Sequence, residues 1–198
     1  MSSELEAELR SHVTAGDLDL ATSRAVGAYG PELLGFLRAI AKSDDLAAEA
    51  FAIASEQLWT NLAKFRWEAQ LRTWFYQLGR NALHQLRIDP RRRADRNLPL
   101  SVITSINDVR RESTPMHQRT TGKQALRELR ESLDPEDHEL LILRLDRDMS
   151  WKDIARTFGA EDVAVDTRAA ALRKRFERVK EQLRELATER GLLPEDNP

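Results

Sequence analysis

The sequence predicts an all-α protein made of two helical-bundle domains that a flexible linker joins. Apolar residues recur at steps of three and four over long stretches, and the first half contains no strand-like alternation of polar and apolar residues. Residues that cap or stop helices stand at the ends of these stretches. Residues 96–122 are rich in Ser, Thr and Asn and have weak periodicity. We therefore assign residues 1–95 to the first domain, 96–122 to the linker and 123–193 to the second domain.

The first domain opens with two helical stretches. Residues 1–13 form a short polar helix that Gly16 and Asp17 end, because glycine readily adopts the left-handed conformation at which helices stop. From 18 to 41 the apolar residues follow a helical period. The pair Gly30-Pro31 interrupts this pattern, and we expect Pro31 to begin a new helix, since proline is well tolerated as a first helical residue.

Two further helices complete the first domain. Ser43 or Asp44 caps a helix that reaches Leu62. The next helix covers about 70–88 and ends at Asp89, because the residue before a proline avoids helical geometry. Within the linker that follows, residues 102–111 allow one short helix.

In the second domain, capping residues mark where the helices begin and end. A helix covers about 123–132, and Asp134 with Pro135 opens the next one, which runs through Leu145. Ser150 with Asp153 opens a short helix as in a capping box, and Gly159 stops it.

A long basic helix follows the turn at Gly159. Asp166 or Thr167 caps this helix, which ends at Gly191. A short helix, a turn with glycine and a basic helix together make a helix-turn-helix candidate. The alternative is an ordinary helical hairpin whose basic face is solvated.

Charge is unevenly distributed along the chain. The whole sequence has a net charge of −2, but residues 65–96 hold eight arginines against three acids, with Trp67, Trp74, Phe75 and Tyr76 among them. A second basic segment covers 168–180. Arginines neutralise phosphates, and aromatic rings stack on unpaired bases, so this block favours nucleic-acid binding. The alternative is a core helix with a solvated basic face.

Other functional classes find little support in the sequence. The chain has no cysteine, no apolar run approaching a membrane span, and an acidic start unlike a secretory signal, so we expect a cytoplasmic protein without membrane insertion. The four histidines are scattered through different elements, and no metal-binding, P-loop or nucleophile motif occurs. We expect neither an enzyme nor a cofactor or metal site.

Two stretches carry a family resemblance. Residues 65–87, FRWEAQLRTWFYQLGRNALHQLR, contain Leu-Arg-Thr-Trp-Phe-Tyr followed by Gly-Arg-Asn. Residues 133–159, LDPEDHELLILRLDRDMSWKDIARTFG, join an apolar helix to the pattern Ser-Trp-Lys-Asp-Ile-Ala. Both are similar to bacterial sigma-70-type sigma factors of the compact extracytoplasmic-function (ECF) kind, over about 20–95 and 123–190. The chain departs from that family by one extra helical turn before Trp59, and by a longer, acidic turn from 159 to 166.

The resemblance implies a function and a set of sites. It implies a protein that binds core RNA polymerase, recognises and melts promoter DNA and directs transcription initiation, with a domain like sigma region 2 followed by a helix-turn-helix domain like sigma region 4. The downstream element and the melted strand would contact Arg72, Trp74, Tyr76, Arg80, Asn81, His84, Arg87, Arg91, Arg92 and Arg93. The upstream element would contact Arg168, Arg173, Lys174, Arg175 and Arg178. The polymerase clamp would contact Asp45, Glu49, Phe51 and Trp59, and the polymerase flap would meet the helix at 140–145.

The residue types fit these roles, and each role has a structural alternative. Trp74 and Tyr76 could stack on splayed bases, Asn81 and His84 could read a flipped base edge, and the arginines could hold phosphates. Trp74 could instead belong to the core, and Asn81 could tie helices together. Asp45 could serve only as a helix-start charge.

A second function remains open at this point. A stand-alone helix-turn-helix transcriptional regulator would explain the second domain but would leave the aromatic and arginine-rich block without a role. The sequence does not name the promoter or the inducing signal, and it leaves open whether an anti-sigma factor binds the chain.

Overall fold

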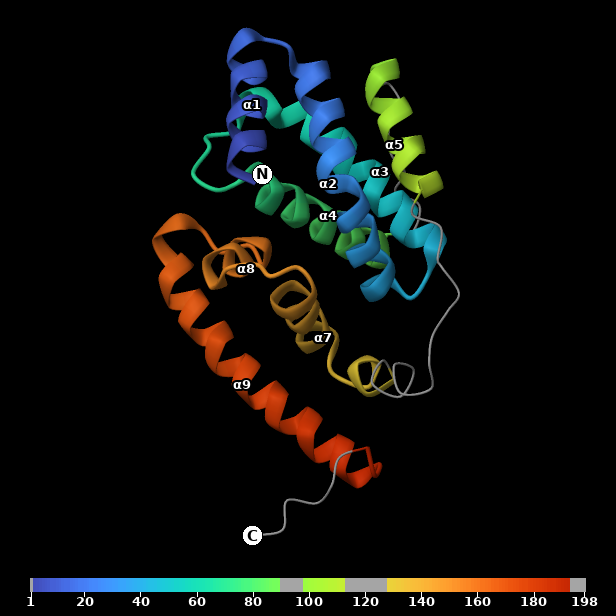
Figure 1. Cartoon of the computed structure of the whole chain (residues 1–198), viewed down its shortest axis with the longest axis vertical. Helices are drawn as coiled ribbons and strands as arrows, with labels where there is room; N and C mark the ends of the chain where they lie inside the picture. Colours follow the sequence, from blue (N-terminus) through green and yellow to red (C-terminus); the bar gives the residue numbers. More distant parts are fainter. Residues whose placement is uncertain (1, 90–97, 113–127, 193–198) are drawn as a thin grey trace. The chain divides into compact units, whose positions relative to one another are not determined.

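The computed structural model describes residues 2–89, 98–112 and 128–192, and every regular element within these ranges is helical (Figure 1). The predicted all-α fold class is therefore confirmed. The chain divides into two compact units, residues 1–114 and 115–198. Within the described ranges, none of the helices combines the length and apolar character that crossing a membrane requires.

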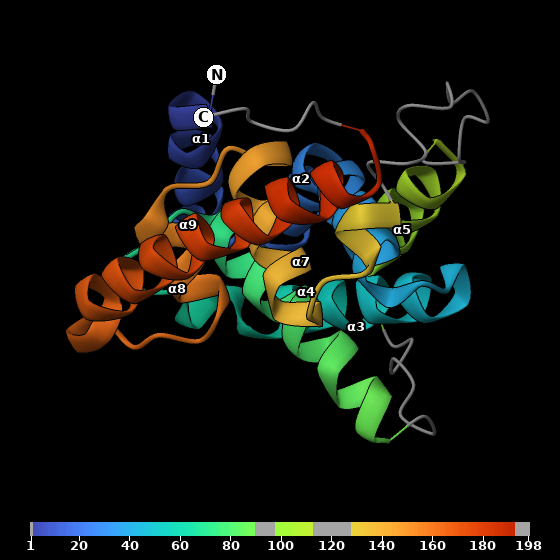
Figure 2. The same ribbon diagram turned by 90° about the horizontal axis from the view of Figure 1, so that it is seen from below.

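The first unit is a bundle built around one long central helix. Its helices are α1 (Ser2–Ala15), α2 (Leu18–Ala41), α3 (Asp44–Asn61), α4 (Leu71–Ile88) and α5 (Leu100–Glu112). Helix α2 packs against the other four (Figures 1 and 2). Side chains such as Phe36, Phe51 and Phe75 fill the core and are fully buried.

The predicted helix boundaries around α1, α3 and α4 are confirmed. Gly16 ends α1 with a φ of +84°, and the N–H of Asp17 bonds the carbonyl of His12 at 2.9 Å, as in a glycine-terminated helix. Ser43 caps α3 by accepting the N–H of Leu46 at 3.3 Å. Asp89 leaves helical geometry at the end of α4.

The predicted break at Gly30-Pro31 is wrong, because α2 continues through both residues. Pro31 and Gly27 both lie on the exposed side of the helix. Proline has no N–H, so the carbonyl of Gly27, four residues earlier, lacks its usual hydrogen bond within the helix. Water can satisfy that carbonyl. Buried side chains on both sides of the proline, such as Val26 and Leu33, hold the helix in the bundle.

Gly30 is required for close packing rather than for a break. A Cβ at this position would lie 3.0 Å from Phe51 Cζ and 3.0 Å from Val109 Cγ2, so α2 meets α3 and α5 here with no room for a side chain. Small-to-large changes in packed cores cost about 1–3 kcal/mol. We expect Gly30→Ala to lower the free energy of unfolding by about that amount, measured by urea denaturation.

Gly27 provides a matched control in the same helix. A Cβ at Gly27 would meet nothing within 4 Å, so Gly27→Ala should raise the free energy of unfolding by about 0.5–1 kcal/mol through helix propensity. Equal effects of the two substitutions would contradict the close approach at Gly30.

Helix α5 extends the first unit into the predicted linker. The expected short helix is present, but it packs along α2 and also touches α3 (Figure 2). Val102, Ile106 and Val109 follow at steps of four and three, and all three are buried. This apolar stripe explains why residues 100–112 belong to the first unit rather than to a free connection.

The second unit holds the predicted helix-turn-helix elements. Residues 128–131 are helical, and they are followed by α7 (Pro135–Leu141), a π-helical turn η2 (Ile142–Asp146), α8 (Trp151–Thr157), a 3₁₀ turn η3 (Asp162–Ala164) and α9 (Val165–Glu189). Helices α7 and α8 both pack on α9 (Figures 1 and 2).

Capping residues set most of the boundaries of these helices. The Asp134 carboxylate accepts the N–H of Glu136 at 3.0 Å, and Ser150 Oγ accepts the N–H of Asp153 at 3.2 Å, as predicted. Gly159 ends α8 with a φ of +84°. The N–H of Ala160 then bonds the carbonyl of Ala155 at 2.9 Å, which completes a Schellman motif.

The predicted cap of the last helix is wrong. Helix α9 begins at Val165, and its N-cap Ala164 makes no side-chain cap bond. The turn η3 supplies the entry to the helix instead, so Asp166 lies in the first turn of α9. Its carboxylate pairs with Lys152 Nζ of α8 at 2.8 Å and so links the two helices of the motif.

Candidate nucleic-acid interface

An aromatic cluster lies on the surface of the first unit where α4 begins. Phe65 and Trp74 are stacked with their ring centroids 4.7 Å apart and an interplanar angle of 10°. Trp67 meets the same Phe65 ring edge-on at 5.1 Å. All three side chains are half-buried. We call Phe65, Trp67 and Trp74 the aromatic platform.

The loop before α4 is held in an unusual conformation at Trp67. This residue has a φ of 59°, in the left-handed region that costs a bulky L-residue about 1–2 kcal/mol. The Arg10 guanidinium of α1 lies over the Trp67 ring, 5.8 Å from its centroid. Such a conformation persists only where neighbouring contacts hold it, and backbone strain of this kind is concentrated at functional sites.

Tyr76 does not belong to the platform, and its predicted role in base stacking is wrong. Its side chain is fully buried and packs on Phe36 with centroids 5.4 Å apart. Trp74 and Tyr76 are two residues apart on a helix, so they point in directions about 200° apart. Only Trp74 can therefore face a nucleic acid.

Arg72 has a structural partner in place of the predicted phosphate. Its Nε and Nη2 donate to the two carboxylate oxygens of Glu32 on α2 at 2.6 and 2.9 Å, and both side chains are largely buried. The hydrogen bonds that Arg72 donates to the Glu32 carboxylate raise the pKa of Arg72. A guanidinium held in this bidentate geometry is not free to bind a phosphate.

We expect this ion pair to stabilise the first unit. Its exposed counterpart is the Arg66–Glu68 pair at 2.8 Å, where both side chains are largely exposed. A double-mutant cycle with Arg72→Met and Glu32→Gln should give a coupling energy of about 1–3 kcal/mol in urea denaturation. The same cycle on Arg66 and Glu68 should give below about 1 kcal/mol, and equal couplings would contradict the assignment.

The polar face of α4 continues from the platform. Asn81 and His84 are exposed, one and two turns after the half-exposed Gln77, so they lie on the same side of the helix as Trp74. A strand stacked on Trp74 could therefore run along a row of amide and imidazole groups. Asn81 and His84, which were predicted to read a base edge, are therefore exposed on the side of α4 that Trp74 shares.

The predicted arginines of α4 differ in their surroundings. Arg80 is half-buried, whereas Arg87 is exposed at the end of the helix, where its Nη2 donates to the carbonyl of Ile40 at 2.6 Å. Arg91, Arg92 and Arg93 lie outside the described residues. Of the arginines on α4 that were predicted to bind phosphates, Arg87 is the one whose side chain is exposed.

The second unit presents cations along α9. The predicted residues Arg168, Arg173, Lys174 and Arg178 are exposed, and none of the four forms an ion pair with another described residue. Exposed Ala170 and Ala171 lie among them, so a neighbouring surface can approach the helix closely. These four residues are spread around the solvent-exposed side of α9, and we call them the α9 cation face.

Arg175 was predicted to bind the upstream element, and the structure contradicts this role. Its guanidinium is half-buried against the start of α7, where it pairs with Asp137, with Glu136 at 2.6 Å and with Asp134 at 3.4 Å. The hydrogen bonds that Arg175 donates to Asp137 and to Glu136 raise the pKa of Arg175. Arg175 therefore fastens α9 to α7, and the cations on either side of it remain exposed.

The predicted polymerase contacts separate into surface and core residues. Asp45 is exposed and Glu49 is half-buried on α3. Phe51 is fully buried and packs on Phe75 with centroids 6.1 Å apart, so its predicted contact with polymerase is wrong. Phe51 and Glu49 are two residues apart on α3, so their side chains point in directions about 200° apart.

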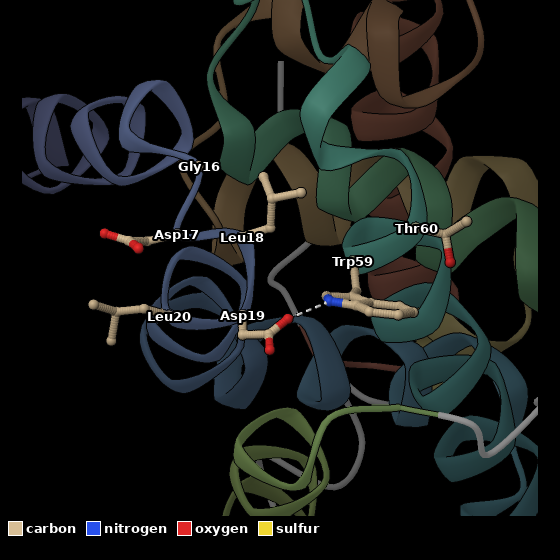
Figure 3. Close-up of a pocket in the computed structure, with 7 residues that line it drawn as sticks. All are labelled: Gly16, Asp17, Leu18, Asp19, Leu20, Trp59 and Thr60. Carbon is tan, nitrogen blue, oxygen red and sulfur yellow. Dashed lines mark hydrogen bonds between the residues drawn. The ribbon is translucent and has the colours of Figure 1, made fainter.

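Trp59 lines an open pocket between the start of α2 and the end of α3. Its Nε1 donates to Asp19 Oδ1 at 2.7 Å, and the indole stands beside this carboxylate (Figure 3). The pocket is lined by Gly16, Asp17, Leu18, Asp19, Leu20, Trp59 and Thr60. Leu20 is a largely exposed apolar residue at its rim. Trp59 is thus half-buried beside an open pocket, and its contact with polymerase stays a prediction.

Sequence reasoning missed Phe65 and the supporting residue Arg10, and it named Trp67 in the aromatic block without assigning it a contact. Phe65 and Trp67 stand in the arginine-rich block, and their aromatic side chains were a usable signal. Arg10 had no signal, because its contact joins residues that are far apart in the chain. Among the described side chains, no group of three acids or histidines is placed to hold a metal ion.

Comparison with protein-family models, with curated proteins and with solved structures finds no significant match for this chain. Function is therefore inferred from the surfaces described above and from the motifs at residues 65–87 and 133–159.

Proposed function

We propose that this chain is a sigma factor of the ECF type, which binds core RNA polymerase, recognises promoter DNA and captures a strand as the duplex opens. The observation that carries the proposal is the aromatic platform at the start of α4, from which the exposed Asn81 and His84 continue along one helix face. Stacking rings followed by hydrogen-bonding groups suit unpaired bases.

The second unit supports the other half of the proposal. A short helix, a glycine-terminated turn and a helix with exposed cations suit a duplex, whose phosphates bind Arg and Lys. Promoter opening needs both kinds of surface, because one part of the DNA stays paired while another is held as a single strand. No covalent chemistry is required of the protein.

In the proposed mechanism, the two surfaces act one after the other. The α9 cation face holds the upstream duplex through phosphates, and residues near the start of α9 lie where recognition helices contact base edges. Trp74 then stacks on a base that has left the duplex, and Asn81 or His84 bonds its edge. Each stacked base contributes about 1–3 kcal/mol, which shifts the opening equilibrium toward the melted state.

A stand-alone helix-turn-helix regulator is the second candidate, and the α8–α9 arrangement taken alone favours it. The two candidates differ in their need for polymerase. A stand-alone regulator binds duplex DNA by itself, whereas a sigma factor opens DNA only together with core polymerase.

Transcription with core polymerase tests the proposal. A supercoiled library of genomic DNA is transcribed by sigma-free core polymerase with and without the full chain, and the start sites are mapped. We expect start sites that depend on the protein and share two upstream sequence elements. Duplex binding without any dependent start site would favour the stand-alone regulator instead.

A further inference from the structure

Helix α4 begins without a cap of its own. Its N-cap residue Gln70 makes no side-chain cap bond, although the first amides of any helix need acceptors. The acceptor comes from α1. Glu6 Oε2 accepts the N–H of Leu71 at 2.8 Å, and Glu6 Oε1 accepts the N–H of Arg72 at 3.2 Å.

The Glu6 carboxylate is itself held in place. The Tyr29 hydroxyl of α2 donates to Glu6 Oε1 at 2.8 Å. Burial, together with the hydrogen bond to Glu6, raises the pKa of Tyr29, so this hydroxyl keeps its proton and remains a donor. A negative charge at the positive end of the α4 dipole adds a further stabilising interaction.

Helix α1 contacts the platform itself one turn after Glu6. Arg10 lies over the Trp67 ring, and Leu9 beside it is fully buried and anchors α1 to the bundle. Because Glu6 and Arg10 are four residues apart, they lie on one face of α1. One side of this short helix therefore reaches both the loop and the helix that make up the platform.

We infer that Glu6 is a positioning residue for strand capture, and that α1 holds the aromatic platform in the geometry that receives an unpaired base. The amides that Glu6 caps precede Trp74 by two and three residues, in the first turn of α4. Movement of that turn would separate the Trp74 ring from Phe65. A platform fixed before binding loses less conformational entropy when a base stacks on it.

This inference rests on the proposed function for its ligand, and its test separates the two. The full chain is titrated with a fluorescein-labelled oligodeoxythymidine of about ten nucleotides, a length in the range of single-strand sites. Glu6→Gln keeps the shape of the side chain but removes the charge and one good acceptor. We expect about fivefold weaker binding, the equivalent of losing one helix cap.

Glu8→Gln is the matched control. Glu8 is on the same helix and pairs with Arg24 of α2, but no contact joins it to the platform. We expect Glu8→Gln to bind the oligonucleotide as the unchanged protein does. In a Trp74→Ala background, Glu6→Gln should have no further effect, because its influence passes through the platform.

NMR gives a readout that does not depend on DNA. In Glu6→Gln, the indole resonances of Trp67 and Trp74 should shift and the amides of Leu71 and Arg72 should exchange faster, whereas Glu8→Gln should change neither. If the oligonucleotide does not bind the unchanged protein while these shifts occur, positioning by Glu6 stands and capture of a strand by the free chain is refuted. The proposed function is then decided by the transcription test with core polymerase.

Two results would overturn the inference. One is unchanged indole resonances and unchanged affinity in Glu6→Gln. The other is an equal loss of affinity with and without Trp74, which would show that Glu6 acts elsewhere. Should Glu6→Gln fold poorly, Tyr29→Phe removes the hydroxyl that orients the carboxylate, leaves α4 untouched and should produce the same indole shifts.

Discussion

Replacing Trp74 with alanine is expected to weaken capture of the melted strand by a factor of about 5 to 150, because stacking contributes about 1–3 kcal/mol per base. Trp74 is half-buried and stacks on Phe65, so the substitution removes the part of the platform that belongs to α4. The effect should appear in the equilibrium between closed and open promoter complexes formed with core polymerase. Binding of the upstream duplex should change little.

The matched variant is Trp74→Phe, which keeps a flat ring beside Phe65. We expect it to restore most of the open complex. Gln77→Ala, one turn further along the same face, should leave opening near normal because it removes no ring. If Trp74→Ala lowered duplex binding and promoter opening equally, the Trp74 ring would act by stabilising the fold, and strand capture at this position would be refuted.

A second large effect, on binding to duplex DNA, is expected from changes to the α9 cation face. Replacing Arg168, Arg173, Lys174 and Arg178 with alanine should weaken binding to duplex DNA and reduce its salt dependence. The slope of log K against log salt should fall in magnitude by about 0.9 for each cation that contacts a phosphate. The measurement is fluorescence anisotropy of a labelled duplex over a range of salt concentrations.

Two controls on the same helix separate charge from structure. Lys180 pairs with Glu177 at 2.6 Å beyond the cation face, so Lys180→Ala should leave the salt slope unchanged. Arg175→Ala should instead lower the free energy of unfolding by about 2 kcal/mol, because three carboxylates lose their partner. A drop in the salt slope with Arg175→Ala, and none with the four exposed cations, would contradict the assignment.

Local signals in the sequence predicted much of the fold. The stops at Gly16 and Gly159 and the caps at Ser43, Asp134 and Ser150 depend on residues within a few positions of each other, so the sequence alone could place them. Periodicity located the helices for the same reason. The failure at Pro31 had a tertiary cause, since buried contacts on both sides keep α2 continuous.

The roles of individual site residues were harder to predict. Arg72 and its partner Glu32 are 40 residues apart, and Arg175 and Asp134 are 41 apart, so no local pattern marks either arginine as a structural residue. Periodicity within α4 could have separated the half-buried Trp74 from the fully buried Tyr76, because the two point in different directions. The contact of Glu6 with α4 spans 65 residues and depends entirely on tertiary structure.

In the proposed function, one surface of this protein holds a melted strand within a complex with core polymerase. Permanganate oxidises unpaired thymines, so its reactivity at a mapped start site reports opening directly. We predict reactive thymines with core polymerase and the unchanged chain, and their loss with Trp74→Ala while protection of the upstream duplex persists. Thymines that stay unreactive with the unchanged chain would refute promoter opening by this protein, and thymines that remain equally reactive with Trp74→Ala would refute strand capture by Trp74.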